Sequence, residues 1–225
     1  MTPNQITAMR ILLAFLAVSL FGHTSAANLA AVVLTVAAIS LDAADGWVAR
    51  RRCLATPLGA QLDILGDRII ENLFFIYFAV VGLISVWVPI LFFVRGTATD
   101  FLRELAAPSG RTGFGENSMV QSPVGRALVA SRFSRGAYGA LKCLCFVCLG
   151  LQLWVHSAAG SHSLGIAWAA FLFSASPWLV GLTVAFCILR ALPVLWEGGS
   201  YLTAFDPSVR AAPGSVAARP LNRAA

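Results

Sequence analysis

The chain has 225 residues, of which 58% are hydrophobic and only 12% are charged, and its formal net charge is +6. So few charged residues do not cover the surface of a soluble domain, which excludes that class and favours a chain embedded in a bilayer. A basic excess can indicate nucleic-acid binding. Here the aromatic residues are not interleaved with a basic stripe, so we expect no nucleic-acid partner.

Apolar residues come in long blocks, each near or above the roughly 20 residues that a helix needs to cross the hydrocarbon core. We therefore predict an all-α fold, a polytopic membrane protein with six transmembrane helices. The expected spans are residues 5–22, 27–49, 59–84, 86–107, 124–156 and 165–197. We expect one membrane domain over residues 1–205 and a disordered cytoplasmic tail over residues 206–225, which are rich in Ala, Pro and Arg.

The connections between these spans alternate in charge. Residues 22–27, 83–88 and 156–163 contain no Lys or Arg. The arginines of the other connections would all lie on the opposite side, and the positive-inside rule places that side in the cytoplasm. Both termini are then cytoplasmic, as an even number of spans requires. A signal peptide would also explain the N-terminal pattern, which is Arg10, an apolar run after it and the small residues 24–27. However, further apolar spans follow at once.

Four carboxylates stand at the ends of the second and third predicted spans. Asp42 and Asp45 share one face of a helix, and Asp63 and Asp67, four residues apart, share one face of the next. The short linker 51–58 makes these helices antiparallel neighbours, so we expect both pairs to converge near the cytoplasmic surface. Four like charges in one cleft favour a hard divalent cation with oxygen ligands.

Small and basic residues accompany these carboxylates. Gly46, Ala49 and Gly59 would let the backbones approach closely, and Arg50 could grip a phosphate oxygen. Metal ions on shared carboxylates neutralise a phosphate during displacement. The competing interpretation is a proton- or cation-transport site. Such sites tend to lie at the bilayer midplane in broken helices, whereas these acids lie at one helix end.

The full string resembles the signature of a known family. It reads Asp42-x-x-Asp45-Gly46-x-x-Ala49-Arg50-x(8)-Gly59-x-x-x-Asp63-x-x-x-Asp67. This matches the signature of the CDP-alcohol phosphatidyltransferase family at every fixed position. The opening Pro3-Asn4-x-Ile6-Thr7-x-x-Arg10 resembles that of many bacterial members. In the family the first span is retained, which argues against a cleaved signal peptide.

The resemblance implies a reaction in which CDP-diacylglycerol donates its phosphatidyl group to an alcohol and CMP leaves. It makes Asp42, Asp45 and Asp63 metal ligands, and gives Asp67 a share of the second metal and the role of general base. It also implies two divalent ions, Mg²⁺ or Mn²⁺, a homodimer among membrane lipids, and an active site facing the cytoplasm of a bacterial inner membrane. The CDP-lipid pocket would include Thr7, Gly46, Ala49, Arg50 and Gly59.

The acceptor alcohol depends on basic residues outside the signature. Arg103, Arg126 and Arg190 occupy places that resemble the basic trio of the inositol-phosphate branch. Arg95 and Arg103 resemble the Arg-Glu…Arg pattern of glycerophosphate-using members, with Gly96 in place of the Glu. We therefore expect a phosphorylated acceptor, glycerol 3-phosphate first and inositol phosphate second, with serine or choline as alternatives. The plainer interpretation is that these arginines snorkel to the interface.

Three further basic residues, Arg132, Arg135 and Lys142, are weaker candidates for the acceptor pocket. Glu71 lies one helical turn beyond Asp67. We expect it to orient Arg68 or to hold water, and we assign it no catalytic role.

Overall fold

The structure is a computed structural model that describes residues 3–51, 57–107, 119–158 and 166–204; the predicted tail, 206–225, lies outside the described residues. Over those residues the chain is all-helical, as predicted. The helices are α1 (Pro3–Leu20), α2 (Ser25–Arg51), α3 (Pro57–Val80), α4 (Trp87–Ala106), α5 (Pro123–Gly125), the π-helical turn η2 (Arg126–Ala130), α6 (Arg132–Ala158) and α7 (Ile166–Ala204).

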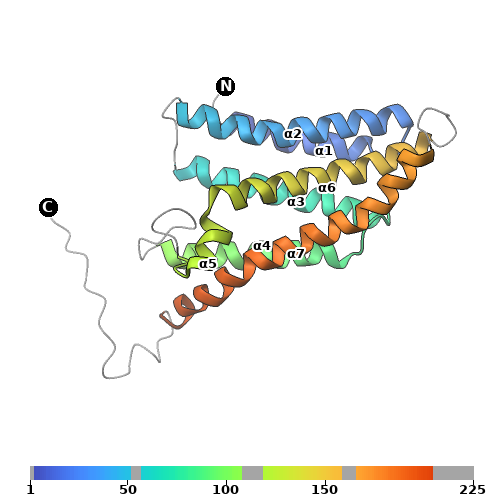
Figure 1. Ribbon diagram of the computed structural model, residues 1–225. Coiled ribbons are helices and arrows are strands. Elements are labelled where there is room, and N and C mark those ends of the chain that lie inside the picture. The colour runs from blue at the N-terminus through green and yellow to red at the C-terminus, as the bar shows by residue number, and fades with distance from the viewer. Residues whose placement is uncertain (1–2, 52–56, 108–118, 159–165, 205–225) are drawn as a thin grey trace, which may run out of the picture.

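The long helices lie side by side in one bundle (Figure 1). α1 packs against both α2 and α3, α6 packs against α2 and α7, and α4 packs against α3 and α7. The end of α2, the start of α3, the end of α4 and the start of α6 gather at the left-hand end in Figure 1, together with the end of α7. This is the end that carries the carboxylate signature and most of the arginines.

The first four predicted spans are each found as a helix. Tight turns at the opposite end of the bundle separate α1 from α2 and α3 from α4. Gly22 and Gly82 have positive φ angles of 86° and 80°, a conformation that suits glycine because a Cβ atom would be strained there. These turns make each pair of helices antiparallel.

The fifth predicted span, 124–156, is wrong as a single helix. The chain forms α5 and η2, breaks at Ser131 in an extended conformation (φ −66°, ψ 141°), and restarts as α6. The Ser131 hydroxyl oxygen accepts a hydrogen bond from the Ser134 backbone N–H at 3.1 Å, which caps the new helix. Arg190 of α7 donates to the Leu128 carbonyl across the break at 2.7 Å. A distant side chain therefore stabilises an interruption that the apolar pattern does not reveal.

The sixth predicted span is found as α7, which extends to Ala204 and includes Pro177 and Pro193. With 39 residues, α7 is about 58 Å long, whereas the hydrocarbon core of a bilayer is roughly 30 Å thick. Within α7, Arg190 lies where it contacts η2 and α6.

Aromatic side chains of α3, α6 and the turn that follows α1 form the main core. Phe75 lies 4.8 Å from Phe146 between ring centroids, and Phe74 lies 5.1 Å from Phe146. Phe21 stacks on Tyr77 at 5.6 Å. These contacts fix the rotation of α3, so that one face meets the core and the face with Asp63 and Asp67 meets the cavity described below.

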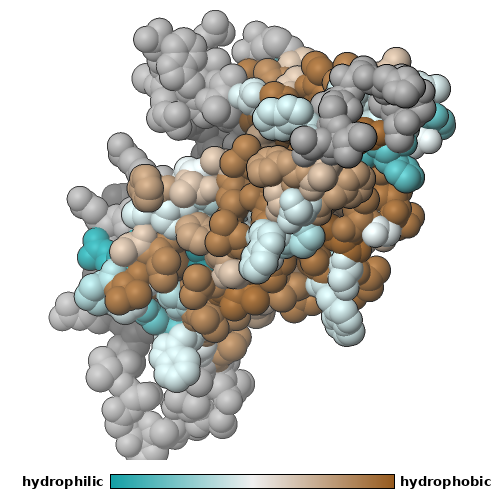
Figure 2. All heavy atoms as spheres, turned by 45° about the vertical axis from the view of Figure 1, so that its right-hand side comes forward, coloured by the Kyte–Doolittle hydropathy of each residue, from teal (hydrophilic) through white to brown (hydrophobic). Residues whose placement is uncertain are grey.

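The outer surface is largely apolar, as Figure 2 shows for one face. Among the described residues, two helical segments, Phe133–Ser157 and Trp168–Ser200, are long and apolar enough to cross a membrane. Asn4–Leu20 and Ser25–Leu41 are shorter apolar helices. The helical fold is therefore confirmed, whereas the six-span topology and the sidedness of the termini stay predictions.

Candidate active site

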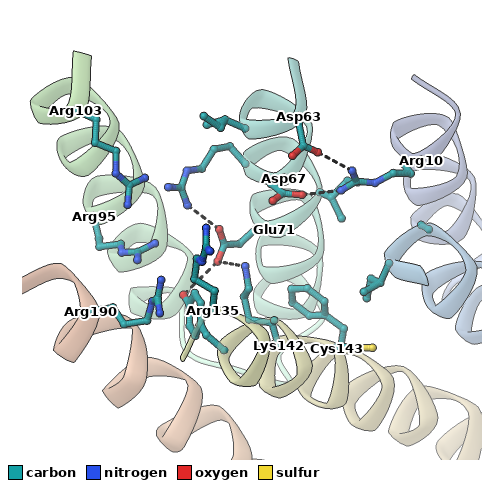
Figure 3. A pocket seen from close by; sticks show the side chains of 18 residues that line it. Arg10, Asp63, Asp67, Glu71, Arg95, Arg103, Arg135, Lys142, Cys143 and Arg190 are labelled. Carbon is teal, nitrogen blue, oxygen red and sulfur yellow. Dashed lines mark hydrogen bonds and ion pairs between the residues drawn. The ribbon is translucent and has the colours of Figure 1, made fainter. Parts of the chain in front are cut away.

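A cavity of about 360 Å³ opens among α1, α2, α3, α4, α6 and α7 near the charged end of the bundle (Figure 3). Of its described lining residues, seven are basic and three are acidic. The basic ones are Arg10, Arg68, Arg95, Arg103, Arg135, Lys142 and Arg190. Basic residues inside a membrane bundle are costly, and their concentration around one cavity marks it as a site for an anion.

The acidic wall comes from one face of α3. Asp63, Asp67 and Glu71 follow one another at intervals of four residues, so helical geometry places them on a single stripe along the cavity. Asp63 and Asp67 lie toward the open end, with side chains 47% and 48% exposed, whereas Glu71 is 3% exposed. The stripe thus runs from two accessible carboxylates to one buried carboxylate.

Arg10 of α1 joins the two accessible carboxylates. Its Nη1 donates to Asp63 Oδ1 at 3.0 Å and its Nη2 donates to Asp67 Oδ1 at 2.6 Å. Gly66 makes this approach feasible, because a Cβ atom there would lie 2.9 Å from Thr7 Cγ2. The predicted site residue Thr7 is therefore buried in the α1–α3 contact.

Glu71 is the counter-ion of the inner cavity. Its carboxylate accepts hydrogen bonds from Arg68 Nη1 at 3.1 Å and lies 3.2 Å from Lys142 Nζ. The Tyr138 hydroxyl donates to the same carboxylate at 3.5 Å. The contact with Arg68 confirms that Glu71 orients this arginine, and the contact with Lys142 ties α3 to α6. Figure 3 shows Glu71 of α3 and Lys142 of α6 pointing toward each other.

A second network joins α3 to α4. Arg68 makes a bidentate pair with Asp100, with distances of 2.7 Å from Nε and 3.0 Å from Nη2, and Arg103 Nη1 donates to Asp100 Oδ1 at 3.0 Å. Gly96 leaves room for Arg68, since a Cβ atom at Gly96 would lie 3.2 Å from Arg68 Nε. The glycine that departs from the glycerophosphate pattern thus lets the arginine of α3 reach α4.

The Tyr138 ring is surrounded by three cations. Lys142 Nζ lies 4.7 Å from the ring centroid, and the guanidinium carbons of Arg190 and Arg95 lie at 5.4 Å and 5.7 Å. Each distance is within the range of a cation–π contact. The ring therefore holds three like charges near one another without neutralising them, which preserves the positive potential of the cavity.

Arg95 and Arg190 differ in what else they contact. Arg190 donates to the Leu128 carbonyl and to the Ser134 hydroxyl. Over the described residues, Arg95 forms no hydrogen bond or ion pair, and its buried Nε lacks a partner. Arg95 lines the cavity and has no hydrogen-bond or ion-pair partner among the described residues, which makes it the strongest basic candidate for an external anion.

The structure brings together part of the predicted site. Asp63, Asp67, Arg103 and Arg190 line the cavity, whereas Arg126 is exposed on η2 and is not among the lining residues, nor is Gly59. The remaining predicted residues stand in the last turns of α2, where the side chains lie outside the described residues. They are Asp42, Asp45, Gly46, Ala49 and Arg50.

The described side chains contain no group of three or more His, Cys, Asp or Glu able to hold a metal ion. Asp42 and Asp45 fall outside that search, so the four-carboxylate site stays a prediction. The donors that are described fit a divalent cation. Asp63 and Asp67 present hard oxygen ligands, are half-exposed to one cavity, and already share a cation, Arg10.

Several lining residues were not singled out by the motif. Glu71 carries a signal, because it continues the four-residue spacing of Asp63 and Asp67. Arg135 and Lys142 both lie in α6, and their spacing gives no comparable sign that they line the cavity. Arg10 was marked only by the opening motif and by its charge, and its contact with the carboxylates depends on how α1 packs against α3.

Comparison with known families matches residues 1–176 to CDP-alcohol phosphatidyltransferase. The chain belongs to this family, whose members are transferases of phospholipid biosynthesis that move a phosphatidyl group from a CDP-alcohol to an alcohol with divalent metal ions. No curated protein matches the chain significantly. Membership in a family of membrane enzymes agrees with the two apolar helical segments and indicates a membrane protein.

Proposed function

We propose that this protein transfers a phosphatidyl group from CDP-diacylglycerol to a phosphorylated alcohol, glycerol 3-phosphate first and inositol phosphate second. The observation that carries the proposal is the excess of basic over acidic side chains in the cavity beside Asp63 and Asp67. A neutral or zwitterionic alcohol does not need such a surplus, whereas a phosphate dianion does.

The donor would bind at the accessible end of the acidic stripe. Asp42 and Asp45 with Asp63 and Asp67 would hold two Mg²⁺ or Mn²⁺ ions. When bound, these ions neutralise the pyrophosphate of the donor. In the family pattern the CDP moiety contacts the first three helices through Thr7, Gly46, Ala49, Arg50 and Gly59.

The chemical step is a displacement at the phosphatidyl phosphorus. The acceptor hydroxyl oxygen forms the new bond to phosphorus, the bond from phosphorus to the bridging oxygen of CMP breaks, and CMP leaves. Asp67 takes the hydroxyl proton. Its side chain is half-exposed to the cavity, and its Oδ1 is held by Arg10, which fixes the orientation of the carboxylate.

The acceptor phosphate would bind deeper, between α4, α6 and α7. Arg95 offers an unpaired guanidinium there, and Arg103 and Arg190 flank it (Figure 3). Arg is suited to phosphate because its planar fork donates two parallel hydrogen bonds. Arg126 would join this pocket only if η2 moved, so we rank it behind Arg95.

The membrane arrangement is part of the proposal. The ends of α2, α4 and α7 and the starts of α3 and α6 gather at one end of the bundle, and the face drawn in Figure 2 is largely apolar (Figures 1 and 2). This arrangement is consistent with six spans, and we propose that both termini and the active site lie at the cytoplasmic face of a bacterial inner membrane, as the charge pattern of the sequence and the family resemblance suggest. Dimerisation is carried over from the family.

A screen of acceptors tests the reaction. Purified protein with CDP-diacylglycerol and Mg²⁺ or Mn²⁺ is offered glycerol 3-phosphate, inositol phosphate, serine and choline, with CMP release and product mass as readouts. We expect CMP release only with a phosphorylated acceptor, and loss of it in Asp67→Asn. Release with serine or choline alone would refute the acceptor assignment. No CMP with any alcohol, together with aspartate-dependent ion flux, would favour a cation-coupled transporter.

Two arginine variants test the acceptor pocket. Arg95→Gln should raise the acceptor KM about tenfold, the effect of losing one charge-assisted hydrogen bond, with little change for CDP-diacylglycerol. Arg126→Ala is the matched comparison, because this arginine is exposed outside the cavity. A larger acceptor effect from Arg126→Ala than from Arg95→Gln would contradict the assignment of the pocket.

A further inference from the structure

Arg10 lies beneath the two accessible carboxylates and is much more deeply buried than they are. Its side chain is 2% exposed, whereas those of Asp63 and Asp67 are 47% and 48% exposed. The guanidinium approaches from α1, and the exposed parts of the carboxylates face the cavity (Figure 3). Arg10 thus lines the same cavity but contacts the two aspartates from their more buried side.

The contact is built into the helix packing. Asp63 and Asp67 lie one turn apart on α3, a spacing that the two terminal nitrogens of a guanidinium can bridge. Both nitrogens are used, one for each carboxylate. The close approach of Thr7 to Gly66 places the start of α1 beside this turn. A lysine has a single nitrogen and would not reproduce the bridge.

We propose that Arg10 is a positioning residue for the metal-binding carboxylates. It holds Asp63 and Asp67 from the buried side and sets the separation at which they face an incoming divalent ion. This inference rests on the proposed function, since it takes the two aspartates to be metal ligands. Groups that hydrogen-bond to metal ligands from behind commonly orient them, and their loss weakens metal binding about 10- to 100-fold.

Electrostatic repulsion alone predicts the opposite effect of losing Arg10 on metal affinity. A positive charge next to two ligands repels a divalent cation, so its removal would tighten metal binding. The same result would follow if Arg10 merely filled the place of the metal and had to leave. Positioning predicts weaker binding when the bridge is lost, even in Arg10→Lys, where the charge is kept. The direction of the change therefore separates the two roles.

The experiment measures Mn²⁺ affinity of the purified full-length protein in detergent by electron paramagnetic resonance, without substrates. We expect Arg10→Lys and Arg10→Gln to raise the Kd for Mn²⁺ about tenfold or more. The charge control is Arg95→Gln, which removes one positive charge from the same cavity and leaves the Arg10 bridge intact. Its Kd should stay the same or fall. An unchanged or lower Kd in Arg10→Lys would overturn the proposal.

Folding is checked by size-exclusion chromatography and thermal unfolding in EDTA. If Arg10→Gln does not fold, Arg10→Lys decides the outcome, because it keeps the charge in place. Failure of the proposed function is distinguishable: wild-type protein would then bind no Mn²⁺ and release no CMP. If the wild type binds Mn²⁺ and Arg10→Lys binds it equally well, only the role of Arg10 is refuted.

Discussion

Replacing Glu71 by Gln should reveal how strongly the cavity depends on its buried counter-ion. The glutamate side chain is 3% exposed and forms ion pairs with Arg68 at 3.1 Å and Lys142 at 3.2 Å. Glutamine keeps the size of the side chain but removes the negative charge. Two cations then face each other across a poorly hydrated space, which is the costly outcome of breaking a buried pair.

The magnitude follows from burial. Loss of one partner from a fully buried ion pair costs about 3–5 kcal/mol. Arg68 and Lys142 are 22% and 20% exposed, and Arg68 keeps its pair with Asp100, so part of the penalty is relieved. We expect a loss of about 2–3 kcal/mol in the free energy of unfolding, which corresponds to a fall in Tm of at least about 4 °C for a chain of this size.

Thermal unfolding in detergent, followed by tryptophan fluorescence, measures the effect. Glu104→Gln is the matched control, because Glu104 is exposed on α4 and should change Tm by less than about 1 °C. Equal Tm values for the two variants would refute the role of Glu71 as a stabilising counter-ion. At a temperature where Glu71→Gln remains folded, loss of a negative charge should also lower the acceptor KM.

Two further predictions concern packing and the helix break. Gly66→Ala should destabilise the protein by about 1–3 kcal/mol, since the new Cβ atom would lie 2.9 Å from Thr7 Cγ2. The control is Gly136→Ala in α6, where a Cβ atom would have nothing within 4 Å. This variant should be neutral or stabilising in the same Tm assay. Arg190→Leu removes the donor to the Leu128 carbonyl, so amide hydrogen exchange should rise in residues 126–134. Unchanged exchange there would contradict a clamp by Arg190.

Much of the fold follows from local patterns. Apolar blocks placed the first four helices and α7 near their observed positions, because a helix in this class of protein is marked by a long run of hydrophobic residues. The break at Ser131 was not foreseen. It lies inside an apolar region, and its stability depends on Arg190, nearly 60 residues away along the chain. Local hydropathy carries no information about such a contact.

The signature could be recognised because its chemistry is local. Asp63 and Asp67 are four residues apart and therefore share a helix face, and the same spacing extends to Glu71. No such spacing predicts which basic residues line the pocket. Arg103 and Arg190 were anticipated and line the cavity, whereas Arg126 was anticipated and lies exposed outside it. The rotation of each helix about its axis decides between these outcomes.

The sequence by itself indicated the reaction class, because the string of carboxylates and small residues over 42–67 resembles the signature of the family to which the chain belongs. Only the tertiary structure decided which charges meet. Arg10 of α1 and Lys142 of α6 form ion pairs with the stripe on α3, and Arg190 of α7 lines the same cavity, so their positions depend on interhelical packing. The physical reason is distance along the sequence. Helical spacing depends on residues a few positions apart. Ion pairs between helices depend on how the aromatic core and the close approach at Gly66 pack helices that are far apart in the chain.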